Sequence, residues 1–116
     1  MSPDGPEPPG ARVVHNAVES QRYEITIDGD SAGFAAYVDT NGQRIFYHTE
    51  TSPEFSDRGL AATLVAAALS DTRADGKRIV AVCPYVAKYV KKHHDFDDIL
   101  DPVTPAATQA VRDLRQ

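Results

Sequence analysis

Alternating apolar and polar residues in the first half of the chain predict β-strands. Tyr23 to Ile27 alternates in this way and runs into the turn Asp28-Gly29-Asp30, which predicts a strand and a hairpin. A second strand is predicted from Gly33 to Val38, and a third, rich in aromatic and β-branched residues, from Ile45 to Thr51. The Asn-Gly pair at 41–42 is a strong hairpin signal between them. The three strands are expected to form an antiparallel meander.

The second half of the chain changes to helical spacing. Leucine and alanine residues recur at helical intervals from Leu60 to the break at Ala74-Asp75-Gly76, where Gly76 is the expected C-cap. The nearly unbroken apolar run from Arg78 to Cys83 predicts a strand buried on both faces. Strand, helix and strand in this order predict a βαβ crossover, with the last strand parallel to the third. Pro84 fits the first turn of a second helix, roughly from Tyr85 to His93.

Together these elements predict a mixed α/β (α+β) fold, in which an antiparallel three-strand meander is followed by a βαβ crossover and a second helix. Residues 1–11, which contain four of the eight prolines, are expected to form a disordered tail. Residues 12–101 form the predicted domain. Residues 102–116 form a C-terminal extension, in which Thr104 and Pro105 favour the start of a short helix.

Composition and charge exclude several classes of function. The chain has 116 residues and a net charge of -5, and this acidity argues against nonspecific binding of nucleic acid. Its one cysteine excludes an internal disulfide and an all-cysteine metal site. No apolar run approaches the roughly 20 residues of a membrane span. No apolar signal-peptide core is present at the N-terminus either, so the expected location is the cytoplasm.

The turn from Ser56 to Ala61 leads directly into the predicted first helix. The first N–H groups of a helix lack partners within it, and the helix dipole adds partial positive charge, so the turn is a candidate anion site. The alternative is structural, with Asp57 as the N-cap and Gly59 as a first-turn glycine. The position between a strand and a helix of a βαβ unit favours a phosphate site, although GxGxxG and GxxxxGK motifs are absent.

This turn and two further segments resemble the GNAT N-acetyltransferase superfamily, specifically its small single-domain subgroup. The GNAT signature Q/R-x-x-G-x-G/A is matched at Gly59 and Ala61, whereas Ser56 departs from the usual glutamine or arginine. The other two segments are Phe46 to Glu50 before the turn and Cys83 to Val90 after the last strand. All three have the order and spacing of the subgroup, and the resemblance covers about residues 23–100.

The resemblance implies that acetyl-CoA is the co-substrate of an amine N-acetyltransferase. The pantetheine arm would then lie where the third and fourth predicted strands separate, with Thr51 and Ser52 on one side and Cys83 on the other. The basic residues of the second helix either meet the CoA phosphates or form a solvated face. The remaining implied contacts, from the pyrophosphate turn and the second helix, are Arg58, Gly59, Leu60, Ala61, Ala62, Thr63, Tyr85, Lys92 and His93.

Acetylation of an amine needs a base, a stabilised oxyanion and a proton for the leaving thiolate. Glu50 is the candidate base, because partial burial can raise the pKa of a carboxylate, and its alternative is a rim glutamate. Strand alternation places His48 on the same face, as a second base, an orienting group or a structural histidine. Tyr89 or Tyr85 is the candidate general acid, although tyrosines at helical spacing also serve as packing.

Cys83 leaves three interpretations open. The cysteine either accepts the acetyl group in a ping-pong reaction, lines the thioester pocket while the amine attacks directly, or only packs as a small hydrophobic residue. Because His93 and His94 are adjacent on a helix and diverge, no metal site is expected.

Three functions compete: an N-acetyltransferase, a CoA-binding module with little or no transferase activity, and a pure interaction protein. GNAT enzymes typically have helices between their first two strands, and the tight turn at 28–30 leaves no such acceptor wall. The acceptor is therefore expected to be an amine on an open site, on a small molecule or a protein or peptide end. The protein is expected to be a monomer or a weak dimer, with no nucleic-acid or membrane partner.

Overall fold

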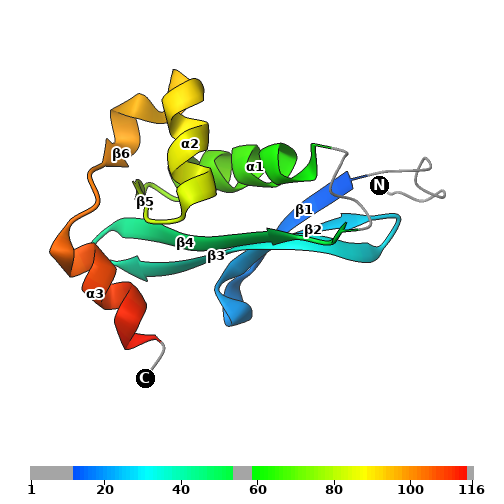
Figure 1. The fold of residues 1–116 in the computed structure, drawn as a ribbon, viewed down its shortest axis with the longest axis horizontal. Helices are drawn as coiled ribbons and strands as arrows, with labels where there is room; N and C mark the ends of the chain where they lie inside the picture. Colours follow the sequence, from blue (N-terminus) through cyan, green and yellow to red (C-terminus); the bar gives the residue numbers. More distant parts are fainter. Residues whose placement is uncertain (1–11, 54–58, 115–116) are drawn as a thin grey trace.

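The computed structural model describes residues 12–53 and 59–114, and these residues form a six-stranded sheet with three α-helices (Figure 1). The strands lie in chain order, antiparallel from β1 to β4 and parallel from β4 to β6. Their bounds are β1 Arg12–Ala17, β2 Arg22–Ile27, β3 Asp30–Thr40, β4 Gln43–Thr51, β5 Arg78–Ala81 and β6 Leu100–Asp101.

The predicted hairpins and the parallel crossover are confirmed. Asp28 and Gly29 both have positive φ, of 52° and 86°, and Asn41 and Gly42 have 52° and 75°. Positive φ at both central residues belongs to the type I′ turn, whose twist matches that of the flanking strands. The sheet has one more antiparallel strand than predicted, β1, which has no buried residue and lacks a clear apolar alternation.

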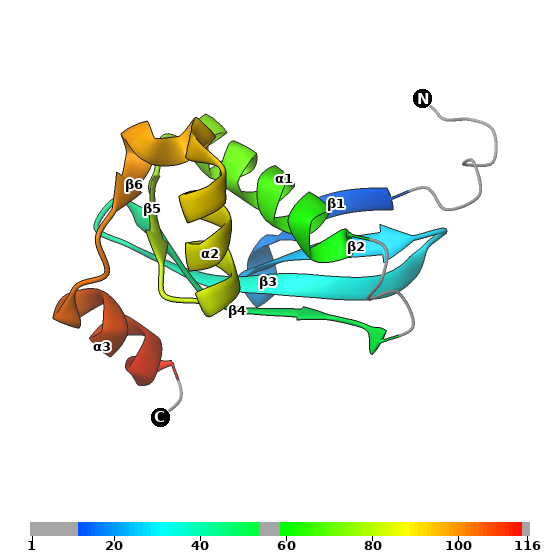
Figure 2. The ribbon, with the colours of Figure 1, turned by 45° about the horizontal axis from the view of Figure 1, so that its top comes forward.

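The helices lie on both faces of the sheet (Figures 1 and 2). The helices α1, Leu60–Ala74, and α2, Pro84–Lys92, cover one face, which we call the inner face. The helix α3, Pro105–Asp113, packs on the opposite, outer face near β4 and β5. Two 3-10 turns, η1 at Val18–Ser20 and η3 at His94–Ile99, complete the described elements.

The main hydrophobic core lies between the sheet and the two inner helices. Leu64 and Leu69 of α1 are fully buried there, together with Ile25 of β2 and Val86 of α2. Burying each such side chain contributes roughly 1.5–3 kcal/mol before entropy costs. A smaller outer core contains Ile45, Val80, Ala107 and Val111. The C-terminal extension expected after residue 101 therefore contains a helix that is packed on the sheet.

A β-bulge at Tyr47 changes which residues of β4 face inward. Ala36 of β3 lies opposite His48, whereas the next residue, Tyr37, lies opposite Phe46, so Tyr47 is the extra residue. Phe46 belongs to the inner core, while Tyr47 packs against the outer core. Because a bulge shifts the alternation by one residue, Thr49 faces inward, opposite Ala35 of the inner core. Uninterrupted alternation would place Tyr47 and Thr49 on one face of β4, whereas the bulge places them on opposite faces.

Candidate functional site

The parallel strands β4 and β5 separate after only four residue pairs. Their pairing ends at Phe46 and Ala81. The backbone N–H groups of Val82 and Cys83 both donate to the Phe46 carbonyl, at 3.0 and 2.8 Å. Beyond this point β4 runs on to Thr51 without a β5 partner among the described residues. The β5 side of this stretch therefore offers backbone groups to an extended ligand.

Cys83 lies where the two strands separate, at the N-cap of α2. Its side chain is only 3% exposed and does not cap the helix. The sulfur instead lies 3.3 Å from the hydroxyl oxygen of Thr49 on β4, which sequence reasoning did not select. The bulge at Tyr47 is what turns Thr49 inward, and an alternation pattern cannot show it. The structure thus brings the predicted Cys83 together with an unpredicted hydroxyl.

The predicted phosphate turn is described from Gly59 onward, and Ser56, Asp57 and Arg58 lie outside the described residues. Gly59 is the N-cap of α1, with a left-handed φ of 67° and no side-chain cap. The first turn of α1 contains no acidic residue that would repel an anion. Arg12 of β1, also missed from the sequence, reaches this end of the helix, where its Nη1 lies 3.4 Å from the Thr63 hydroxyl.

A cavity of about 280 Å³ lies between the start of α1 and the length of α2. It is lined by Ala62, Tyr85, Lys88, Tyr89, Lys92 and His93, all of which except Lys88 are residues that the sequence assigned to the site. The rings of Tyr89 and His93 are 4.4 Å apart. Burial, followed by the nearby Asp95 carboxylate, raises the pKa of Tyr89 above its ordinary value. Tyr89 is therefore protonated at neutral pH and has a proton to donate.

A second cavity, of about 480 Å³, is lined by Glu50, Thr51 and Ser52 together with the start of β3. The Ser52 N–H already donates to the Ala32 carbonyl at 2.7 Å. It is therefore not free for a pantetheine arm, and Thr51 is the better placed of the two predicted residues.

His48 and Glu50 lie together, as expected, but on the outer face of β4. Their side chains approach to 3.4 Å between Nε2 and Oε1, and the His48 ring packs beside Phe34. The Glu50 side chain is 63% exposed, so the partial burial assumed for a base is absent. Because Cys83 and Thr49 lie on the inner side, this pair can act only on an acceptor that approaches from the outer face.

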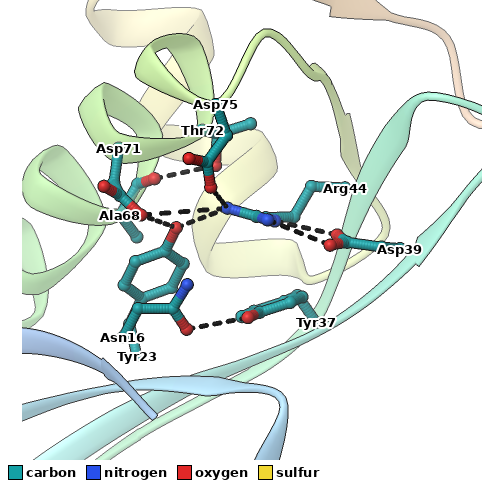
Figure 3. Close-up of polar contacts among 9 residues, drawn as sticks. All are labelled: Asn16, Tyr23, Tyr37, Asp39, Arg44, Ala68, Asp71, Thr72 and Asp75. Carbon is teal, nitrogen blue, oxygen red and sulfur yellow. Dashed lines mark hydrogen bonds and ion pairs between the residues drawn. The ribbon is translucent and has the colours of Figure 1, made fainter. Parts of the chain in front are cut away.

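A buried arginine ties the inner face of β4 to α1 (Figure 3). The Arg44 side chain is 4% exposed and donates two hydrogen bonds to the Asp39 carboxylate, at 2.8 and 2.9 Å. Its Nη1 donates to the Tyr23 hydroxyl at 2.6 Å and to Asp75 at 3.0 Å. Tyr23 in turn donates to Asp71 at 2.6 Å. No local sequence pattern indicates this network, because its members come from three distant segments.

The electrostatics of this network keep Arg44 charged and Tyr23 neutral. Burial lowers the pKa of Arg44, but the hydrogen bond to Asp39 and the neighbouring groups raise it more, leaving it above its ordinary value. Burial, followed by the hydrogen bond to Asp71, raises the pKa of Tyr23 well above its ordinary value. The network is therefore a fixed support for β4 and α1 near neutral pH.

Two features are absent from residues 12–53 and 59–114. None of their helices is long and apolar enough to cross a membrane. These same residues contain no group of three or more His, Cys, Asp or Glu side chains that could hold a metal ion.

Comparisons with known proteins agree with this architecture. The family model for the GCN5-related N-acetyl-transferases matches residues 22–99, which is more than half of the chain. A GCN5-like candidate N-acetyltransferase from Staphylococcus aureus is 18% identical, with a TM-score of 0.61 over 80% of this chain and 91% of that one. Ard1 from Thermoplasma volcanium is 16% identical, with a TM-score of 0.53 over 68% of this chain and 58% of that one. The comparison with curated proteins found no match.

Proposed function

Because the chain belongs to the GCN5-related N-acetyltransferase family, we propose that it transfers an acetyl group from acetyl-CoA to an amine. The observation that carries the proposal is the separation of β4 and β5 after Phe46, with Cys83 buried where the strands part. An extended thioester arm placed there would meet the open backbone groups of β4 and the N-terminal end of α2. Both supply partial positive charge to a developing oxyanion.

The donor would be held mainly by α1 and α2. The pyrophosphate would lie at the start of α1, from Gly59 to Thr63, where the first N–H groups of the helix and the helix dipole favour an anion. Lys92 and His93 line the cavity between the two helices, where Lys92 supplies a cation and the His93 ring an N–H donor for further phosphate oxygens. Arg58, which lies outside the described residues, belongs to the same predicted turn.

In the direct route, the amine nitrogen forms a bond to the acetyl carbonyl carbon and the carbon–sulfur bond to CoA breaks. The amine loses a proton to a base, for which Glu50 is the candidate with His48 beside it. The CoA sulfur gains a proton from Tyr89, whose raised pKa keeps its hydroxyl protonated. In this route Cys83 lines the thioester pocket.

In the covalent route, the Cys83 sulfur first takes the acetyl group and releases CoA, and the amine then takes the acetyl group from the sulfur. Intact mass after incubation with acetyl-CoA, compared with Cys83→Ala, separates the two routes. A Cys83-dependent acetyl adduct together with lost turnover in Cys83→Ala supports the covalent route. No adduct and full turnover in Cys83→Ala support the direct route.

A second candidate function is a CoA-binding module with little transferase activity. It is favoured by the short connection between β1 and β2, where Val18–Ser20 forms one 3-10 turn instead of helices that would wall an acceptor site. The turn at 28–30, to which the sequence assigned this missing wall, instead joins the second and third strands. Calorimetry with acetyl-CoA tests both functions, because absence of heat would overturn both. Incubation of labelled acetyl-CoA with a panel of amines then separates them, since only the transferase yields labelled amide.

A further inference from the structure

Thr49 and Cys83 are 34 residues apart in the chain, yet the Thr49 hydroxyl oxygen lies 3.3 Å from the Cys83 sulfur. We propose that Thr49 is a positioning residue that holds the Cys83 sulfur and stabilises its thiolate by donating a hydrogen bond to it. This inference rests on the proposed function, in which Cys83 lies beside the acetyl thioester.

The backbone around Cys83 fixes one side of this contact. The Cys83 N–H donates to the Phe46 carbonyl at 2.8 Å, and the Cys83 carbonyl accepts from the Ala87 N–H at 2.9 Å, in the first turn of α2. Its side chain does not cap that helix, although the N-cap position normally uses the side chain for this purpose. The sulfur is therefore left for a partner from another element.

The bulge of β4 fixes the other side. Tyr47 is the extra residue there, and without it Thr49 would point to the outer face. Thr49 lies opposite the fully buried Ala35, so its side chain is directed into the inner face where α2 begins. Among the described residues the hydroxyl has no hydrogen-bond partner other than the sulfur.

The chemistry of the pair sets the direction of the effect. In the neutral pair either atom can be the donor, but a thiolate can only accept, so the Thr49 hydroxyl then has to donate. A hydrogen bond to a charged group stabilises the charged form. Replacing the hydroxyl with a methyl group should therefore move thiolate formation to higher pH. Replacing threonine with serine keeps the donor and should leave thiolate formation where it is.

The test is a pH titration of the single cysteine of the chain. The ultraviolet absorbance of the thiolate is measured for the wild type, Thr49→Val, Thr49→Ala and Thr49→Ser, each with its Cys83→Ala counterpart subtracted. Thr108→Val on α3 is the matched control, since its hydroxyl bonds to the Thr104 carbonyl at the start of its own helix. We expect the valine and alanine variants to titrate about one pH unit higher, a tenfold effect, and the serine and control variants to match the wild type.

The outcomes are decisive without any acetyl-CoA. Folded Thr49→Val or Thr49→Ala that titrates like the wild type overturns the proposal. Loss of folding in both, with Thr49→Ser folded, assigns the hydroxyl a structural role and overturns it as well. Failure of the proposed function would appear separately, as absence of heat with acetyl-CoA, and would leave the titration result standing.

Discussion

The Nη1 of Arg44 donates a 2.6 Å hydrogen bond to the hydroxyl of Tyr23, and both side chains are buried beneath α1. The contact joins the second and fourth strands of the sheet across the strand between them. Since Tyr23 also donates a hydrogen bond to Asp71, its hydroxyl both accepts and donates. A buried phenol with both functions used leaves no polar atom unsatisfied at this point of the core.

Removal of the Arg44 side chain is expected to destabilise the fold strongly. Arg44→Met would leave the Tyr23 hydroxyl without its donor and Asp39 and Asp75 without their cation, at a cost of about 3–5 kcal/mol. Arg44→Lys keeps the charge but cannot bond Asp39 through two nitrogens and reach the other partners, so it should be intermediate. Denaturant unfolding measures both, and a loss below about 1 kcal/mol in Arg44→Met would contradict the prediction.

Gly59→Val is expected to weaken acetyl-CoA binding more than it weakens the fold. A valine at φ 67° costs roughly 1–2 kcal/mol of stability, and its side chain would also occupy the space above the start of α1. Gly42→Val is the matched control, because Gly42 has φ 75°, equally open surroundings and a place in the β3–β4 hairpin. If both variants lose similar stability but Gly59→Val loses much more affinity for acetyl-CoA by calorimetry, the phosphate site is supported. Equal losses of affinity in the two variants would make Gly59 purely structural.

Lys92→Gln is expected to lower the affinity for acetyl-CoA several-fold, and more at low salt. The lysine lines the cavity between α1 and α2, and attraction between exposed charges is screened as ionic strength rises. Lys77→Gln removes a lysine that lies after the other end of α1 and serves as the control. Titration at two salt concentrations checks the prediction, and an affinity unchanged in Lys92→Gln would remove this residue from the donor site.

Glu50→Gln should lower acetyl transfer about a hundredfold or more if Glu50 is the base, with acetyl-CoA affinity unchanged. The amide keeps the size of the side chain but cannot take a proton from the amine. His48→Gln is the companion variant, because the two side chains are in contact at 3.4 Å. Steady-state kcat/KM, measured with the amine from the panel that is acetylated fastest, decides whether Glu50 or His48 is the base. Unchanged kcat/KM in Glu50→Gln, with loss in His48→Gln, would assign the base to the histidine.

The strand pair at the β5–β6 edge should lose stability in acid. Hydrogen bonds from Gln43 and then Arg78 lower the pKa of Asp101 below its ordinary value. A group with a lowered pKa in the folded state stabilises the fold above its unfolded pKa, and this contribution disappears as pH falls through the folded value. Asp101→Asn should therefore be less stable than the wild type at neutral pH, with the difference shrinking in acid. Thermal unfolding across pH measures this, with Asp30→Asn as the control. A stability difference between the wild type and Asp101→Asn that stayed constant with pH would contradict the prediction.

The elements with strong local signals were predictable from the sequence. The Asn41-Gly42 turn, the helix from Leu60 and the parallel strand after Arg78 all occur as expected. The strand β1 was missed because it has no buried residue and its partner supplies the apolar side chains. The bulge at Tyr47 was missed because it follows from strand pairing and not from local sequence. The face to which His48 and Glu50 belong depends on that bulge, so it could not be read from alternation alone.

The polar anchoring of α1 is concentrated in its last turns. Asp71 and Asp75 bond the buried pair of Tyr23 and Arg44, and the Thr72 hydroxyl bonds back to the Ala68 carbonyl. The other end of the helix, at Gly59, has no side-chain cap among the described residues. The described polar anchors of α1 thus lie mostly at its C-terminal end, whereas its start is held chiefly by burial of Leu60, which is 1% exposed. Amide hydrogen exchange along α1 should accordingly slow from the first turn towards the last, and binding at Gly59 should slow the first turn most.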